Sequence, residues 1–177
     1  FAKYWTHNGL IKVNGQKMSK SLGNSLLLDD LMKKYTDEAV KFGLLQTNYR
    51  GDINVTDALF PEAEKHMLSF YKVMEEAESK GLKLDGSDES IDRAFDEAMD
   101  DDFNTAKALA DLFALCRTAG AKLRAGDLAG ANDILGQVKK TYSLLGLFRA
   151  APAGFVERCE AKHRAAVPEE VTALIKK

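Results

Sequence analysis

The sequence predicts a mainly α-helical fold, in which a small strand-loop-helix connecting module is followed by an antiparallel α-helical bundle. Apolar residues recur every three or four positions in most of the stretch 59–145, which is the spacing of one helix face. Residues 10–24 lack this period and contain the turn signals Asn14-Gly15 and Gly23. The breaks between the later periodic stretches are short, so neighbouring helices are expected to pack antiparallel.

The connecting module is expected to begin with a strand and then to become helical. Residues 10–13 alternate in part between apolar and polar side chains, and Asn14-Gly15 follows them as a turn. Two aspartates open a short helix at 29–35, where their charge suits the positive end of the helix dipole. Thr36 is the candidate N-cap of a second helix, which supplies a buried face up to residue 45.

The helical bundle is expected to begin after a break at residues 49–52. Thr56 is the candidate N-cap of its first helix, and Asn104 or Thr105 caps a later one. Gly126-Asp127 separates the last two helices of the bundle. The residues expected to face inward are Leu59, Ala63, Met67, Phe70, Met74, Ala77, Ile91, Phe95, Ala98, Leu109, Leu112, Phe113, Cys116, Leu123, Leu128, Ala131, Leu135, Val138, Tyr142 and Leu145.

These breaks divide the chain into three parts. Residues 1–52 form the loop-bearing connecting module, and residues 53–148 form the helical bundle. Residues 149–177 form a tail in which the periodic pattern fades, apart from some helical character at 171–175. Both ends of the chain fall within a pattern rather than at a break. We therefore expect a piece of a longer protein, with the tail leading into a C-terminal region that is missing here.

The net charge of −2 conceals a strong asymmetry along the chain. Residues 1–50 carry eight Lys and Arg against four Asp and Glu, residues 51–102 carry five against sixteen, and residues 103–177 carry twelve against seven. The two basic flanks suit a phosphate-bearing partner, which the acidic middle would repel. The alternative is that these charges only solvate the outer faces of helices.

Several classes of protein are excluded by composition. No run of about 18 apolar residues exists, so a membrane partner is not expected. The two cysteines, Cys116 and Cys159, belong to no CxxC or Cys/His cluster, so a cytoplasmic protein without disulfides is expected. Cys116 lies on an apolar stripe and is assigned to the core. Cys159 has His163 four residues later, but two ligands do not make a zinc site, so no metal site is predicted.

The segment Lys17-Met18-Ser19-Lys20-Ser21 is the candidate binding loop. Two lysines three positions apart, with serines beside them, can surround a polyphosphate, because ammonium groups are compact charges and hydroxyls add hydrogen bonds. If an adenylate forms here, charge builds on the departing pyrophosphate. A mobile lysine would then stabilise the transition state more than the bound substrate. The alternative is an ordinary basic surface loop.

The longer string resembles the KMSKS motif of class I aminoacyl-tRNA synthetases, with Lys17–Ser21 matching at all five positions. The continuation Leu22-Gly23-Asn24 also matches. Three further segments, Tyr4–Gly9, Tyr49-Arg50 and Met99–Thr105, are similar to cysteinyl-tRNA synthetases. The resemblance runs from residue 1 to about residue 148 and is weaker in the tail.

This resemblance implies a function and a set of partners. It implies a cysteine–tRNA ligase that uses ATP to form cysteinyl-adenylate and then esterifies tRNA(Cys). Lys20 is the residue implied to act on ATP, and Lys17 with the serines shapes the loop. The connecting module would lie against the inner corner of the tRNA, and the bundle would lie along it toward the anticodon stem.

The resemblance also implies that parts of the enzyme are absent. The HIGH motif and the ligands of a cysteine-selecting zinc ion belong to a region upstream of Phe1, and His7–Leu10 is not a version of that motif. The chain alone is therefore expected to be inactive. Two alternatives stay open: a cysteine ligase of thiol biosynthesis, which uses the same adenylation on an amino sugar, and a non-catalytic RNA-binding module.

Three single residues and one run of aspartates are interpreted as follows. Arg50 either contacts a tRNA phosphate or joins the two modules through a salt bridge. Trp5 is assigned to the core in preference to a nucleotide contact. His66 is assigned to the surface or boundary of the long helix. The run Asp100–Asp102 could hold a divalent metal, but capping of the following helix is the preferred interpretation.

Overall fold

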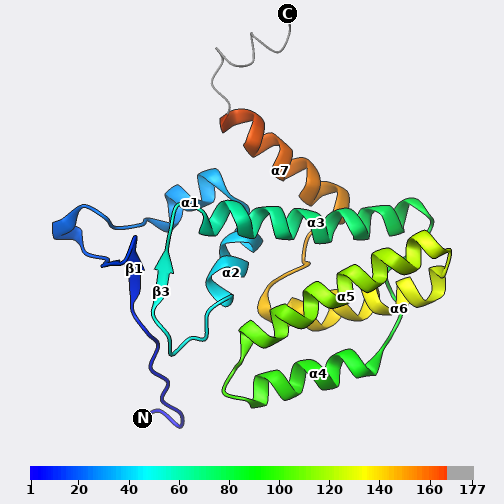
Figure 1. Ribbon diagram of the computed structural model, residues 1–177, viewed down its shortest axis with the longest axis horizontal. Coiled ribbons are helices and arrows are strands. Elements are labelled where there is room, and N and C mark those ends of the chain that lie inside the picture. Colours follow the sequence, from blue (N-terminus) through cyan, green and yellow to red (C-terminus); the bar gives the residue numbers. More distant parts are fainter. Residues whose placement is uncertain (167–177) are drawn as a thin grey trace, which may run out of the picture.

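The computed structural model describes residues 1–166, apart from the side chains of Lys20, Ala165 and Ala166 (Figure 1). Seven α-helices and a three-stranded sheet lie within this range, so the predicted mainly α fold class is confirmed. The predicted helical character at 171–175 lies outside the described residues. The elements are β1 (Ile11–Val13), β2 (Gln16–Lys17), α1 (Leu28–Lys34), α2 (Asp37–Leu45), β3 (Ile53–Val55), α3 (Leu59–Ser79), α4 (Glu89–Asp100), α5 (Thr105–Ala125), α6 (Leu128–Tyr142) and α7 (Pro152–Ala166).

The sheet has the strand order β2-β1-β3. β1 and β2 pair antiparallel through the predicted turn, in which Asn14 and Gly15 have φ of 49° and 80°, the left-handed values that favour a tight hairpin. β3 pairs parallel with β1, so the strand module extends to residue 55 instead of ending at residue 52. A Cβ on Gly9 would lie 2.1 Å from the carbonyl oxygen of Gly51. Only glycine allows the two chain segments to approach this closely.

Side-chain caps begin most of the helices. Thr36 accepts a hydrogen bond from the amide of Ala39 at the start of α2, as predicted. Asn104 does the same for Lys107 in α5, and Asp127 for Gly130 in α6. The predicted cap of α3 by Thr56 is wrong: its N-cap position is Ala58, which makes no side-chain cap bond. The chain enters α3 through a turn in which the amide of Leu59 donates to the carbonyl of Thr56.

The predicted apolar stripes form the main core between α2 and α7. Sixteen of the twenty residues expected to face inward are buried, and the other four are half-buried: Leu59, Phe113, Leu128 and Leu145. In Figure 1, α5 and α6 lie side by side, with α3 above them and α4 below. The short Gly126-Asp127 turn makes α5 and α6 antiparallel. His66 is half-buried and its ring centroid lies 4.8 Å from that of Phe113, which agrees with the predicted boundary position.

Replacing Leu135 by alanine is expected to lower the free energy of unfolding by about 2–5 kcal/mol. Leu135 lies at the middle of α6 and is 0% exposed, so the truncation leaves a cavity. Urea unfolding measures the change. Leu144→Ala is the matched control, since Leu144 is 74% exposed and should leave the unfolding midpoint almost unchanged. Equal midpoints for the two variants would contradict the assignment of Leu135 to the core.

Helix α7 corrects the expectation of a fading tail after residue 148. It begins with Pro152, which suits the first position of a helix because that position needs no N–H donor. Phe155 stacks on Tyr71 of α3 with ring centroids 3.9 Å apart, and Cys159 is fully buried. Pro152 and Val156 are also buried, so the apolar face is continuous but spans only about two turns. The surface on which the helix packs exists only once α3 is in place.

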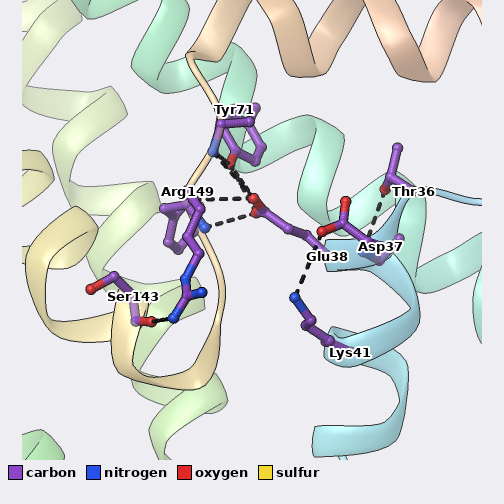
Figure 2. A network of polar contacts seen from close by, with 10 residues as sticks. Thr36, Asp37, Glu38, Lys41, Tyr71, Ser143 and Arg149 are labelled. Atoms are coloured by element: carbon purple, nitrogen blue, oxygen red, sulfur yellow. Dashed lines mark hydrogen bonds and ion pairs between the residues drawn. The ribbon is translucent and has the colours of Figure 1, made fainter.

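A buried glutamate joins the connecting module to the end of the bundle (Figure 2). Glu38 of α2 is 2% exposed, and its carboxylate accepts a hydrogen bond from the hydroxyl of Tyr71 at 2.8 Å. It also accepts from the backbone amides of Phe148 at 2.7 Å, Arg149 at 3.1 Å and Ala150 at 3.3 Å. This carboxylate therefore fixes the chain that leads from the bundle into α7. From sequence, Glu38 was only an acid beside a helix cap.

Candidate functional site

The candidate binding loop follows the hairpin of β1 and β2 and projects at the edge of the molecule (Figure 1). Lys17 is the last residue of β2 and is exposed, while Met18 and Ser19 are half-buried. Lys20–Leu22 form a 3₁₀ turn. The loop is therefore a short ordered projection that starts directly from the sheet.

Asn24 closes this loop from within. Its side-chain oxygen accepts from the amide of Ser19 at 2.9 Å, and its side-chain nitrogen donates to the carbonyl of Lys17 at 3.3 Å. Gly23, with φ of 65°, lets the chain turn back toward this contact. Sequence reasoning placed Asn24 in the motif but assigned it no role. The signal was an asparagine at the end of a polar turn, where its side chain can take the place of a backbone partner.

Met18 anchors the loop to the sheet. Its amide donates to the carbonyl of Ile11 in β1 at 3.2 Å, and its sulfur accepts from the amide of Leu26 at 3.5 Å. The segment between Met18 and Asn24 is thereby held at both ends. Methionine fits this role because its flexible thioether can fill an irregular gap and accept a weak hydrogen bond.

The groups between these anchors fit an anionic ligand. The hydroxyl oxygens of Ser19 and Ser21 lie 3.2 Å apart, and the Ser19 hydroxyl also accepts from the amide of Leu22. With the exposed Lys17, they gather one cation and two hydroxyls on a turn of the chain. Phosphate oxygens take such donors, so the residues present suit a polyphosphate.

Arg50 takes part in an ion pair between the modules. Its guanidinium contacts the carboxylate of Asp102 at 2.5 and 3.0 Å, and the hydroxyl of Tyr49 donates to the same carboxylate at 2.8 Å. The guanidinium and the hydroxyl hold the pKa of Asp102 below its usual range. Of the two interpretations of Arg50, the salt bridge between modules is therefore the one that the structure contains.

The aspartate run ends one helix and leads to the next. Asn104 caps α5, as predicted, but the preferred interpretation of the aspartate run is wrong: Asp100 ends α4, Asp101 is the C-cap of α4, and Asp102 pairs with Arg50, so none of them caps α5. Asp102 and Phe103 both have positive φ, of 52° and 54°, in the tight connection between the helices. Within residues 1–166, no group of three or more His, Cys, Asp or Glu is placed to hold a metal ion.

Trp5 corrects one expectation and the cysteines meet another. Trp5 is 69% exposed, so its assignment to the core is wrong for this chain. Cys116 is in the core as predicted, and burial raises the pKa of its thiol to about 12. Burial likewise raises the pKa of Cys159 to about 12. The imidazole of His163 contacts the carboxylate of Glu64 at 3.0 Å, so the partner of His163 is Glu64 and not Cys159.

Among the described residues, no helix is both long and apolar enough to cross a bilayer.

Two family models match separate parts of the chain. Residues 1–65 match the model described as "tRNA synthetases class I (C) catalytic domain", which includes the candidate loop. Residues 94–149 match the model described as "DALR domain", which covers the end of α4 with α5 and α6. The two matches thus fall on the loop-bearing module and on the helical bundle.

Curated bacterial proteins are similar to almost the whole chain. A protein of Geobacter metallireducens named "Cysteine--tRNA ligase" is 37% identical over 99% of this chain and 40% of its own length. Proteins with the same name from Pseudomonas aeruginosa and Laribacter hongkongensis are each 38% identical, over 99% and 89% of this chain. These matches span 37% and 33% of the two proteins. The chain therefore spans less than half the length of these curated relatives.

Proposed function

Because the chain is homologous over almost its whole length to part of cysteine--tRNA ligases, we propose that it belongs to an enzyme that activates cysteine with ATP and transfers it to tRNA(Cys). The observation that carries the proposal is the combination of this similarity with an ordered, cation-bearing loop inside the matched catalytic region. Cysteine, ATP and tRNA(Cys) are the proposed substrates.

In the first proposed step, a carboxylate oxygen of cysteine attacks the α-phosphorus of ATP. The bond from that phosphorus to the bridging oxygen breaks, and pyrophosphate leaves with the electron pair. Lys20 is assigned to the β and γ phosphates, where charge grows during the step. Lys17, Met18, Ser19 and Ser21 complete the ATP loop. In the second step, a hydroxyl of the tRNA 3′-terminal ribose attacks the carbonyl carbon, and AMP leaves.

The two modules are proposed to have different roles. Residues 1–52 are proposed to carry the ATP loop and the connection toward the tRNA, and β3 continues this module by pairing with β1. The helical bundle, residues 53–148, is proposed to face the tRNA through its basic part from residue 103 onward, rather than through the acidic α3 and α4. The ion pair of Arg50 with Asp102 joins the module to the loop before α5.

The isolated chain is expected to form no cysteinyl-adenylate, because it lacks most of the length of its relatives. The assay is cysteine-dependent exchange of pyrophosphate into ATP. The full-length protein should be active in this exchange and should then load tRNA(Cys) but not an amino sugar. Exchange by the isolated chain above that of a boiled sample would contradict the first expectation. Loading of the amino sugar instead of tRNA would favour a ligase of thiol biosynthesis.

A further inference from the structure

Five basic side chains line one pocket between α1, α3 and α7. The pocket has a volume of about 570 Å³, and its basic residues are Lys33, Lys34, Lys65, Lys162 and His163. No acidic side chain is among the described residues that line it. Lys162 and His163 of α7 are far in sequence from the other basic residues. They come close to them only in the folded chain, where α7 packs on α3 and contacts α1 (Figure 1).

Two of these groups hold the helices together. The ammonium of Lys162 donates to the carbonyl oxygens of Met32 at 2.6 Å and Lys33 at 3.3 Å, so it neutralises the negative end of α1. His163 contacts the fully buried Glu64, whose other oxygen accepts from the amide of Thr36 at 2.8 Å. The carboxylate behind the pocket is therefore already engaged by donors on two sides.

The remaining lysines of the pocket differ in whether they form an ion pair. Lys33 pairs with Asp30 at 2.7 Å. Lys34 and Lys65 are exposed, and neither has a carboxylate within 4.0 Å among the residues that the structure describes. They reach the same pocket from different helices. Asp30 is close enough to Lys34 to feel its charge, but neither ammonium group is in an ion pair in the described part of the chain. With both on one hollow, this surface carries a local excess of positive charge.

The chemistry of the lining favours the backbone of a nucleic acid over its bases. Lysine binds phosphate as a point charge, and such contacts position a nucleic acid without reading its sequence. No amide or carboxylate side chain that would recognise a base edge lines the pocket in the described part of the chain. Tyr35 and Pro61 complete the wall with apolar surface.

We propose that this pocket binds the phosphodiester backbone of RNA through Lys34 and Lys65. That the RNA is tRNA rests on the proposed function. The site departs from the expectation drawn from charge blocks, in which the acidic segment 51–102 faces away from RNA. Lys65 belongs to that segment, but the fold places it beside the basic residues of α1 and α7.

The test compares charge reversals within one helix. Lys65→Glu, Lys34→Glu and the control Lys72→Glu are each titrated with a labelled RNA duplex and with a tRNA(Cys) transcript, at two or more salt concentrations. Lys72 is exposed and lies about two turns further along α3. It lines a different hollow, with Glu75, Glu76, Glu157 and Glu160. Fluorescence anisotropy gives the dissociation constants.

The two pocket variants are expected to bind both RNAs at least about fivefold more weakly than the unmodified chain, while Lys72→Glu changes affinity by less than about twofold. Each pocket variant should also lower the slope of log affinity against log salt by about 1. Lys65→Gln removes the charge without reversing it and should give an intermediate loss. Circular dichroism checks that these exposed substitutions leave the fold intact.

Three outcomes overturn the site. The first is an equal loss of RNA affinity for Lys65→Glu and Lys72→Glu, and the second is no RNA binding by the unmodified chain. The third is binding of pyrophosphate at the pocket without binding of the duplex, a result that would indicate a site for a small anion. The proposed function is tested separately by cysteinylation in the full-length protein. Failure of cysteinylation with a pocket-dependent loss of duplex binding would reject the function and leave the RNA site standing.

Discussion

Under the proposed function, replacing Lys20 by alanine in the full-length protein is expected to slow formation of cysteinyl-adenylate by roughly a hundredfold or more. Ground-state binding of ATP should change far less. The reason is that negative charge grows on the leaving pyrophosphate only as the bond to the α-phosphorus breaks. An ammonium placed there acts mainly on the transition state, so its loss appears in the rate.

Stopped-flow measurement of a single turnover separates the rate of adenylation from the dissociation constant of ATP. Lys83→Ala is the matched control, because Lys83 is an exposed lysine in the loop between α3 and α4, away from the candidate binding loop. Lys20→Arg keeps the charge and should retain more of the rate than Lys20→Ala. An unchanged rate with a weakened affinity for ATP would show that Lys20 acts on bound substrate and not on the transition state.

Replacing Glu38 by alanine is expected to lower the free energy of unfolding by about 3–5 kcal/mol, because a buried donor left without an acceptor costs about 1–3 kcal/mol and several donors are affected. Tyr71 and three consecutive backbone amides, those of residues 148–150, donate to this carboxylate (Figure 2). Without it, these buried donors lose their partner and pay for desolvation with no compensating bond.

The neighbouring Asp37 provides the control for Glu38. Its side chain is 41% exposed and lies 3.6 Å from Lys41, so Asp37→Ala should change stability by less than about 1 kcal/mol. Glu38→Gln preserves the shape and one accepting oxygen, and should fall between the two. Urea unfolding followed by circular dichroism gives the free energies. If Glu38→Ala and Asp37→Ala unfold at the same midpoint, the network does not hold α7 and the bundle together.

The helices from α3 to α6 were predictable because their information is local. The apolar period reports which face of each helix is buried. Asn104 and Gly126-Asp127 mark the ends of α5 and the start of α6 with side chains or a glycine that satisfy terminal backbone groups. α7 has a short apolar face, in which Pro152, Phe155, Val156 and Cys159 are buried at helix spacing. This signal was overlooked because it covers only two turns and stands among polar residues and alanines.

The prediction of the candidate loop also rests on local information, since residues with phosphate-binding chemistry stand together in the chain, and its role stays a prediction. The role of Asn24 was less evident, because a side chain that replaces a backbone partner leaves no periodic signal. Trp5 shows that a local signal can also mislead. Its aromatic character favoured the core, but whether an apolar residue is covered depends on which other segments reach it.

The sequence by itself determined the fold class, the hairpin turn and most of the helix faces, because each follows from residues close together in the chain. The role of the candidate loop stays a prediction. Only the tertiary structure decided the partner of Arg50, the network around Glu38 and the pocket that contains Lys34 and Lys65. These contacts join residues that are far apart in sequence. A hydrogen bond or a cluster of charges requires its groups to be close in space. Residues distant in the chain become close only when the helices pack, so the order of residues alone does not show these contacts.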